Sequence, residues 1–383
     1  MHPVQGGAAA KSVMGAVVAR LDRLDALRGI AALLVVWQHT SESFVKIPGV
    51  AERGSWLADL AWSVDFGRIG VVCFFLISGF IIPHSFSSGP GALKKFAIRR
   101  LFRLYPVYWV SILVALMAGS ILANRHWEPI AVITNLSMMQ KLLGQEHIQG
   151  LYWTLQVELI FYILCACLFF SGKMKNMVFL TFFAGGCLFV FVGQELLLRS
   201  IAGEESISAE LRYIPYFLSI MFCGTLLRAV FWEEHPLSRK LFFLTAPAAA
   251  FGIPALVLML HFLGFSVVDQ PVRFGAAYLI ALAIFLLAIF IPWRVPGILA
   301  WFGLISYSIY LFHPVAMRIV HWTNKQSWAG FTENWALWVY MSAGFAITLL
   351  IATCTFYLIE RPAIAVGRRL SRRKVMTEGM AVT

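Results

Sequence analysis

Ten apolar segments dominate the sequence, and each is about as long as a helix that crosses a membrane. The hydrocarbon core of a bilayer is about 30 Å thick and requires about 20 mostly apolar residues in a helix. Since 60% of the 383 residues are hydrophobic and only 13% are charged, we predict an all-α, polytopic helical membrane protein with about ten transmembrane helices. The predicted spans are residues 24–45, 66–84, 104–124, 151–171, 176–194, 211–231, 241–264, 274–292, 297–321 and 335–359.

One transmembrane domain is predicted to take in almost the whole chain. It covers residues 24–362 and follows a polar N-terminal arm, residues 1–23, which we expect to be mostly disordered. Residues 363–383 form a short basic tail. The six cysteines fall in apolar segments without metal-ligand or secreted-disulfide spacing, so we interpret them as packing residues and predict no metal site.

Lysine and arginine are concentrated in alternate connecting segments. The arm has three, the 85–103 loop has five and the tail after Glu360 has six. Because cytoplasmic segments carry an excess of positive residues, we predict that both termini and the 85–103 loop are cytoplasmic. The acidic 195–210 loop is expected outside. This topology explains the net charge of +12, so nucleic acid is not expected as a partner.

The first predicted span carries two ionisable residues, Arg28 and His39, on one face. They are eleven positions apart, which at about 100° per residue brings them within about 20° of each other and about 16 Å apart along the axis. Ionisable groups at membrane depth usually face a protein interior or a wet cavity and mark a functional pathway.

Three ionisable residues are predicted at one depth in the outer half of the membrane. His39, Glu158 and His313 reach this level in three different spans, which indicates a shared cavity. A neutral histidine, with an unperturbed pKa of ~6.5, suits general-base activation of a hydroxyl. The alternative is that His39 only bonds a neighbouring helix. Glu158 could orient His39, bind an acceptor sugar or pair with an arginine for structural reasons.

The cytoplasmic end of the third span carries a pair of arginines. Arg100 and Arg103 are i,i+3 neighbours on a helix, and planar guanidinium groups bind phosphates well. Arg28 is expected at the same level, so the three could line a phosphate-binding entrance. The alternative is an anchor on anionic lipid, which requires only positive charge.

Several further residues could line a sugar site. Trp153, Asn135 and Tyr307 could do so together with His313, although aromatic residues near a membrane interface are more often belt residues. The Ser78-Gly79 pair in the second span is interpreted as a site of close helix packing.

Six sequence stretches, taken in order, resemble the membrane acyltransferase 3 family. They are RLDALRGIAALLVVWQH, GVVCFFLISGF, RRLFRLYP, WTLQVELIFY, ISYSIYLFHP and FYLIERP. The resemblance runs from Arg20 to about Pro362. The family's arginine, ten residues and histidine signature falls on Arg28 and His39, its Arg-x-x-Arg falls on Arg100 and Arg103, and its membrane glutamate falls on Glu158.

The resemblance implies an O-acyltransferase, and most simply an O-acetyltransferase, of the bacterial inner membrane. Family members O-acetylate exopolysaccharides, lipopolysaccharide O-antigens, nodulation factors and some macrolides. By resemblance, acetyl-CoA is a cytoplasmic co-substrate, with no permanently bound cofactor, and the acceptor is an outward-facing saccharide. His39 would be the general base with Glu158 assisting, and Arg28, Arg100 and Arg103 would hold CoA phosphates.

The chain departs from the family's pattern in two places. Many members have Ser-Leu-Ser-Val-Glu where this chain has Thr154 to Glu158, which weakens any role for serines there. Many also have a periplasmic SGNH-type esterase domain after the membrane domain. Here only the basic tail follows, so we expect this chain to act alone or with a separate partner. Polysaccharide biosynthesis or export proteins and membrane lipids are the other expected partners.

Two other classes of protein remain open from the sequence. In a transporter, the same buried charges would form a substrate or proton path, although we find no repeat-related halves. A glycan-binding scaffold of an export complex would show neither acyl transfer nor transport.

Overall fold

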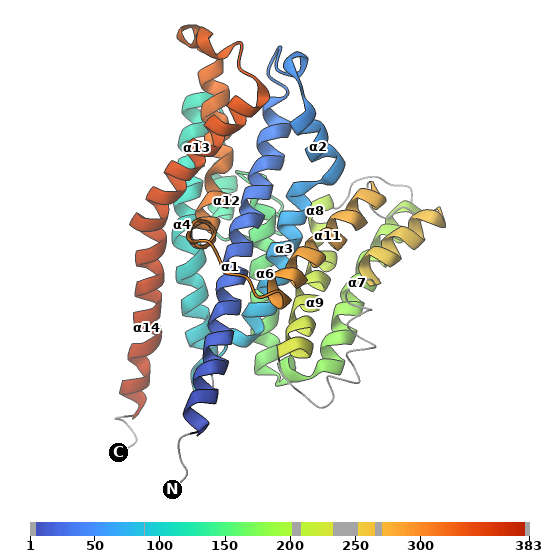
Figure 1. Ribbon diagram of the computed structural model, residues 1–383, viewed down its shortest axis with the longest axis vertical. Coiled ribbons are helices and arrows are strands. Elements are labelled where there is room, and N and C mark those ends of the chain that lie inside the picture. Colours follow the sequence, from blue (N-terminus) through green and yellow to red (C-terminus); the bar gives the residue numbers. More distant parts are fainter. Residues whose placement is uncertain (1–4, 88, 201–207, 233–251, 265–269, 380–383) are drawn as a thin grey trace.

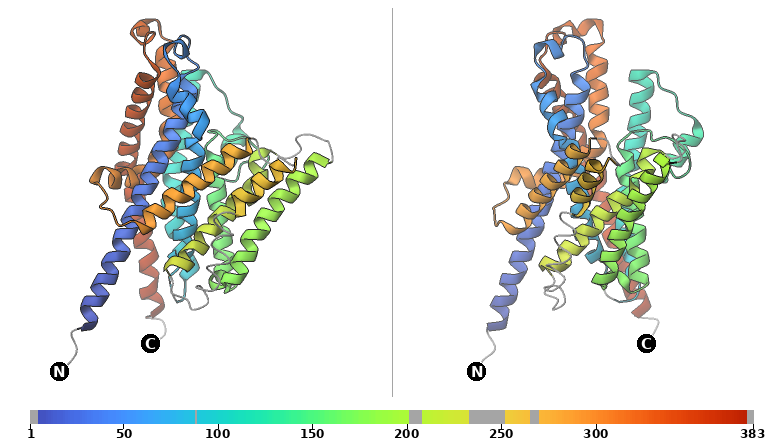
Figure 2. Two further views of the ribbon diagram at one scale, coloured as in Figure 1. Left: turned by 45° about the vertical axis from the view of Figure 1, so that its right-hand side comes forward. Right: turned by 90° about the vertical axis from the view of Figure 1, so that its right-hand side faces the viewer.

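The computed structural model describes residues 5–87, 89–200, 208–232, 252–264 and 270–379. Within these ranges the chain consists of helices and connecting loops, with no strand, and the long helices form an elongated bundle (Figure 1). The two ends of the chain emerge at the same end of the molecule (Figures 1 and 2). The predicted all-α class is therefore confirmed.

The long helices account for most of the described residues, and short helical turns connect several of them. The α-helices are α1 (Gln5–Phe44), α2 (Trp56–Val64), α3 (Phe66–Ile81), α4 (Ala92–Ala123), α5 (Pro129–Asn135), α6 (Tyr152–Phe170), α7 (Met177–Ser200), α8 (Ala209–Arg212), α9 (Ile214–Trp232), α11 (Pro271–Phe290), α12 (Gly297–Asn324), α13 (Leu337–Thr355) and α14 (Arg361–Gly379). The short turns are η1 (Ala51–Arg53), η2 (Ile82–Ser85), η3 (Lys173–Lys175), η4 (Ser327–Thr332) and the π-helical turn η5 (Phe356–Glu360).

Eight of the helical stretches in the described residues are long and apolar enough to cross a membrane. The protein is therefore a membrane protein. The predicted number of ten transmembrane helices is approximate. The eight stretches are Phe66–Ser85, Ala92–Ala123, Tyr152–Phe170, Met177–Leu198, Glu210–Val230, Pro271–Phe290, Gly297–Asn324 and Leu337–Arg372. All but the last residue of the predicted span 24–45 lies within α1, which is not among the eight. Polar residues such as Asp25 and Gln38 interrupt the apolar sequence of this helix. The predicted span 241–264 lies partly outside the described residues, and its described part contains a shorter apolar helix, Gly252–Phe262.

The N-terminal arm was expected to be mostly disordered, and this expectation is wrong, because α1 begins at Gln5 and continues without a break to Phe44. The arm is rich in alanine and has no proline after Pro3. Since the buried part of α1 already supplies the helix nucleus, each further residue is added without a new nucleation cost. The basic tail is likewise helical, as α14.

Close approaches at glycines set the positions of the central helices. Helix α1 contacts α2, α3, α11, α12 and α13. A Cβ atom on Gly29 of α1 would lie 2.8 Å from the backbone nitrogen of Gly303 in α12, and one on Gly303 would lie 2.2 Å from the carbonyl oxygen of Asp25. The two helices therefore touch backbone to backbone at this point, which only glycine permits.

A second pair of helices, α3 and α9, is packed in the same way. A Cβ on Gly79 would lie 1.8 Å from the carbonyl oxygen of Met221, and one on Gly224 would lie 2.4 Å from that of Leu76. The interpretation of Ser78-Gly79 as a packing site is thus confirmed. Helices α7, α9 and α11 form a tilted side layer next to α3 (Figure 2).

Candidate active site

Two histidines meet where α1 and α12 run side by side. His39 lies ten residues after Gly29, and His313 lies ten residues after Gly303. The two helices run in the same direction away from the contact between Gly29 and Gly303. Equal rises of about 15 Å along each helix therefore bring the two rings to one level. Nδ1 of His39 is 2.8 Å from Nε2 of His313, and the rings stack with their centroids 5.0 Å apart.

The hydrogen bonds of His313 define the tautomers of this pair. Nδ1 of His313 lies 2.8 Å from the backbone carbonyl oxygen of Tyr310, and a carbonyl can only accept, so this nitrogen donates. In a neutral His313, Nε2 then carries the lone pair and accepts from Nδ1–H of His39. A neutral His39 is therefore left with its lone pair on Nε2, for which no hydrogen-bond partner is found among the described residues.

His39 and His313 line a cavity of about 600 Å³, here called the outer chamber. Its walls combine apolar residues and aromatic rings with polar side chains of both charges; the aromatic residues are Trp153, Tyr213, Phe217, Phe274 and Tyr310, and the polar ones are Gln38, Glu42, Asp65, Arg68 and Arg273. A mostly apolar cavity with a few converging polar groups is the usual form of a small-molecule site.

Charges in the outer chamber are largely compensated. Nε of Arg68 is 3.1 Å from a carboxylate oxygen of Asp65, and the guanidinium of Arg68 lies 4.2 Å from the ring centroid of Phe274. Arg273 is 3.9 Å from the same carboxylate oxygen of Asp65 and donates to the carbonyl oxygen of Ala61. The chamber therefore carries little net charge, which suits a neutral ligand.

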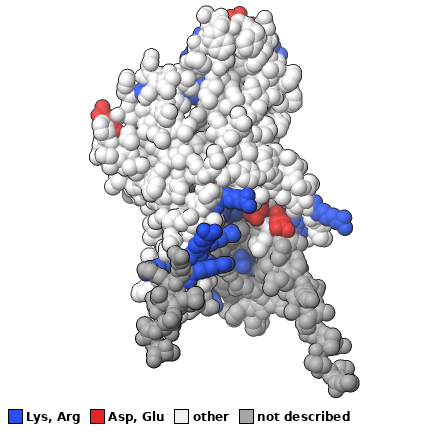
Figure 3. Space-filling model, turned by 90° about the vertical axis from the view of Figure 1, so that its left-hand side faces the viewer, with Lys and Arg blue, Asp and Glu red and all other residues white. Residues whose placement is uncertain are grey.

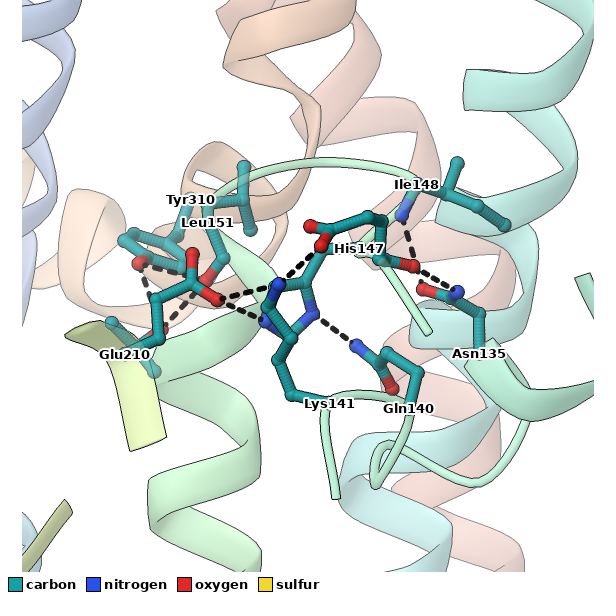
Figure 4. A network of polar contacts seen from close by, with 10 residues as sticks. Asn135, Gln140, Lys141, His147, Ile148, Leu151, Glu210 and Tyr310 are labelled. Atoms are coloured by element: carbon teal, nitrogen blue, oxygen red, sulfur yellow. Dashed lines mark hydrogen bonds and ion pairs between the residues drawn. The ribbon is translucent and has the colours of Figure 1, made fainter. Parts of the chain in front are cut away.

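Asn135 holds the loop that borders the outer chamber (Figure 4). Its side-chain nitrogen donates to the carbonyl oxygens of Ala131, at 2.7 Å, and Glu146, at 2.9 Å. Its side-chain oxygen accepts from the backbone nitrogen of Ile148 at 3.1 Å. The side chain is fully buried and does not line the outer chamber. The structure thus places it as a clamp on the loop.

The same loop is tied to α8 by a second set of polar contacts (Figure 4). The Gln140 amide contacts Nδ1 of His147, and Nε2 of His147 is 3.2 Å from Oε2 of Glu210. The loop continues to Gly150 and Leu151, which line the outer chamber, and Tyr213 lines it just after α8. These contacts therefore join two parts of the chamber wall.

A narrow central cavity of about 70 Å³ lies next to the outer chamber and shares Val71 and Tyr310 with it. Arg28, Arg103 and Glu158 line this central cavity. Glu158 accepts hydrogen bonds from the hydroxyl of Tyr162 and from Ser78, the latter at 3.4 Å. Tyr307 also lines it and donates to the carbonyl oxygen of Leu104 at 3.0 Å.

Two arginine-lined cavities follow on the other side of the central cavity. The larger, of about 770 Å³, shares Arg28 and Arg103 with it. The smaller, of about 380 Å³, is lined by Arg99, Arg100 and Arg103 of α4. Figure 3 shows the basic side chains gathered on one face, with a few acidic ones beside them. The four cavities thus form a row linked by shared wall residues.

The structure revises how the predicted site residues are grouped. His39, His313 and Trp153 share the outer chamber, but Glu158 lies in the central cavity with Arg28 and Arg103. The expected shared cavity of His39, Glu158 and His313 is therefore not found, because equal depth does not fix the direction in which a side chain points. The residue that orients His39 is His313.

Glu360 was not singled out in the sequence. It is 2% exposed, accepts a 2.7 Å hydrogen bond from Ser308, and lines the larger arginine-lined cavity. Its position in the apolar run FYLIERP was the available signal, since a carboxylate among apolar residues is seldom buried without a polar partner.

The described residues therefore form a helical membrane protein in which a narrow cavity joins a chamber that contains two histidines to cavities lined by arginines. The chain belongs to the acyltransferase 3 family: the family model described as "Acyltransferase domain" matches residues 21–357. The resemblance seen in the sequence is thereby confirmed, and the protein is a membrane acyltransferase.

Relatives of known name extend over most of this chain. Nodulation protein 10 of Rhizobium leguminosarum bv. viciae is 26% identical and aligns with 92% of this chain and 96% of its own length. Proteins of Staphylococcus aureus strains COL and N315, each named "Putative O-acetyltransferase", are 24% identical over 88% of this chain. The chain covers only 56% of the length of these Staphylococcus relatives. No solved structure matches the chain.

Proposed function

We propose that the protein is an O-acetyltransferase of the bacterial inner membrane. It would take an acetyl group from cytoplasmic acetyl-CoA and transfer it to a hydroxyl of a cell-surface or lipid-linked saccharide, without a permanently bound cofactor. The row of cavities from the arginine-lined end through the central cavity to the His39–His313 pair carries this proposal. Both termini and the arginine-lined end face the cytoplasm in this assignment, because cytoplasmic segments are rich in lysine and arginine.

The arginine-lined end fits the donor. Coenzyme A carries a diphosphate and a ribose phosphate, and arginine binds such groups with paired donors. Arg28 and Arg103 line both the larger arginine-lined cavity and the central cavity. The central cavity, of about 70 Å³, is far smaller than the outer chamber and the larger arginine-lined cavity, which favours a slender chain that ends in a thioester over a sugar ring. Arg28 and His39 are about 16 Å apart along α1, and such a chain has to cover this separation.

The histidine pair supplies the acid–base chemistry. His39 Nε2 accepts the proton of the acceptor hydroxyl while the hydroxyl oxygen bonds to the acyl carbon. The carbon–sulfur bond of the thioester breaks, and His39 returns the proton to the departing thiolate. Throughout the reaction, Nε2 of His313 accepts a hydrogen bond from Nδ1–H of His39. This hydrogen bond strengthens when His39 becomes an imidazolium, because a charged donor makes a stronger hydrogen bond.

The outer chamber fits a neutral saccharide. Trp153 and the other rings offer apolar faces to the C–H groups of a sugar, and the polar residues offer partners for its hydroxyls. The Staphylococcus relatives, each named "Putative O-acetyltransferase", support acyl transfer to a hydroxyl.

The proposal is tested with the purified full chain in nanodiscs, radiolabelled acetyl-CoA and the saccharides of the producing cell. We expect label on a saccharide, in an ester bond that mild base releases. Mass spectrometry of surface glycans from a deletion strain should show the loss of the same ester. Ion-coupled flux in vesicles without label transfer would instead show a transporter, and the absence of both would show a scaffold.

A further inference from the structure

Helix α14 is docked tightly on α4 at the arginine-lined end. A Cβ on Gly367 would lie 2.6 Å from Cβ of Phe102, so glycine is needed for this approach. One turn further, the hydroxyl of Ser371 accepts a 3.1 Å hydrogen bond from Nε of Arg99. Gly367 and Ser371, four residues apart, form a small-residue face of the kind that allows close packing of helices. The basic tail is thereby fixed beside α4.

This docking makes α14 a second wall of both arginine-lined cavities. Arg368 and Arg372 line the larger and the smaller cavity, as does Arg103 of α4. Eight arginines line one or both cavities, whereas the described lining residues include only two carboxylates, Asp25 and Glu360. Both carboxylates belong to the larger cavity, so the described lining of the smaller one is free of acidic residues.

Three arginines of α14 have no acidic partner within the part of the chain that the structure describes. Among the described residues, no carboxylate lies within ion-pair distance of Arg368, Arg369 or Arg372. Elsewhere at this end, Arg28 is 3.3 Å from Asp25, and Arg100 lies over the rings of Phe96 and Tyr162. Like charges held together by a tightly packed helix repel one another, and a bound polyanion would relieve this repulsion.

The order of groups along coenzyme A determines which phosphate meets which wall. The diphosphate lies between the pantetheine arm and the ribose, and the ribose carries the remaining phosphate at its 3′ position. If the pantetheine arm of coenzyme A enters the central cavity past Arg28 and Arg103, the ribose phosphate has to lie further from the central cavity than the diphosphate. The smaller cavity shares only Arg103 with the central cavity, whereas the larger one shares both Arg28 and Arg103, so the smaller one is the less directly connected of the two.

We propose that Arg368 and Arg372 of the tail helix, docked on α4, bind the ribose 3′-phosphate of the acyl-CoA donor in the smaller, acid-free cavity. Arg28 and Arg103 then hold the diphosphate. This inference rests on the proposed function, since it assigns a second wall to the same donor site. It gives the basic tail a role in donor recognition beyond the orientation of the chain in the membrane.

The test compares coenzyme A with 3′-dephospho-coenzyme A, which lacks only the phosphate in question. Binding is measured by calorimetry on the full chain in phosphatidylcholine nanodiscs, for wild type and for the double variant Arg368→Gln, Arg372→Gln. Wild type should bind coenzyme A about one to two orders of magnitude more tightly than the dephospho form, as expected for bonds to a charged group. In the double variant the two affinities should become nearly equal, with little change for the dephospho form.

Arg294→Gln is the matched control. Arg294 is exposed and lies outside the lining of the arginine-lined cavities, so this variant should keep the wild-type ratio of affinities. A double variant that still discriminates between the two ligands, or that loses affinity for both equally, would overturn the assignment of the 3′-phosphate. If wild type binds neither ligand, the proposed donor fails as well, so the two failures are distinguishable.

A lipid phosphate could occupy the same arginines. The titrations are therefore repeated in nanodiscs that contain phosphatidylglycerol. We expect the wild-type ratio of affinities to persist there, because the smaller cavity binds the nucleotide phosphate in preference. Disappearance of the ratio in anionic discs would show that a lipid headgroup fills the cavity, and would contradict the proposal.

Discussion

The two ends of the row of cavities differ sharply in charge. The arginine-lined end has eight arginines and two carboxylates in its described lining, and several of these arginines have no acidic partner among the described residues. The outer chamber has Arg68 and Arg273 against Glu42 and Asp65, with two histidines and a set of aromatic rings. One end thus carries an excess of positive charge, and the charges of the other nearly cancel.

Under the proposed function, this difference would let one protein bring together two reactants that do not share a compartment. The excess of positive charge would draw a phosphate-bearing donor to one end, and the narrow central cavity would admit its slender acyl-bearing arm. The chemistry would then take place at the other end, beside His39. Substitutions at the two ends should therefore affect different kinetic parameters.

The largest effect is expected at the base. His39→Ala should lower the rate of acyl transfer by about 10²–10⁴-fold, the usual contribution of a general base. Binding of coenzyme A should remain at the wild-type level, because the phosphates bind at the other end. Turnover is measured with labelled acetyl-CoA and binding by calorimetry. Turnover near the wild-type rate would remove His39 from the mechanism, and loss of the protein from the membrane would instead favour a structural role for His39.

An intermediate effect is expected at the arginines of α4. Arg103→Lys should raise the KM for acetyl-CoA by about one to two orders of magnitude, because contacts to charged groups contribute about 1.5–3 kcal/mol and lysine cannot reproduce the paired donors. Arg103 lines three of the four cavities, so it should be the more sensitive position. Arg100→Lys should raise KM less, since Arg100 lines only the smaller cavity and rests on aromatic rings.

For these arginine variants, kcat at saturating donor and the amount of protein in the membrane should stay near wild type. Raising the salt concentration should weaken wild-type donor binding in the same direction, because exposed phosphate contacts are screened. If both variants bind acetyl-CoA as wild type does, the arginines are lipid anchors, and the donor entrance lies elsewhere.

The smallest effect is expected at His313, which acts by positioning His39. His313→Ala removes the acceptor of a hydrogen bond that strengthens as His39 becomes charged. The charged bond exceeds the neutral one by about 1–1.5 kcal/mol, so kcat should fall by about five- to tenfold. In His313→Gln the side-chain oxygen can still accept from Nδ1–H of His39 and should restore part of the rate. Equal losses in the two variants would contradict the positioning role, as would a loss confined to KM for the donor.

The sequence predicted those parts of the fold and site that depend on a single helix. Hydropathy found the class and most of the spans, and helical periodicity placed Arg28 and His39 on one face. These patterns did not predict the helical N-terminal arm, because the arm has no periodic pattern of apolar residues. They also did not give the exact number of spans, because α1 is partly polar and packs within the bundle. Hydropathy measures the preference of residues for an apolar environment over water, and a helix surrounded by other helices does not need to be apolar on all sides.

Contacts between helices could not be read from the sequence. His39 and His313 are 274 positions apart, and their pairing depends on the glycine contact between α1 and α12. Depth placed Glu158 level with His39, but its rotation about α6 directs it to the arginines instead. Glu360 lies just beyond the last predicted span, 335–359, so the assignment of spans gave no reason to expect it at a buried site.

The central claim is that donor and acceptor sites lie at opposite ends of the protein, and sidedness of labelling tests it most directly. Inside-out and right-side-out membrane vesicles from the producing cells contain the cell's own acceptor, and membrane-impermeant radiolabelled acetyl-CoA is added outside. The account predicts that only inside-out vesicles, which expose the arginine-lined end, incorporate label into saccharide, and that vesicles with His39→Ala do not. Equal labelling of right-side-out vesicles would contradict it.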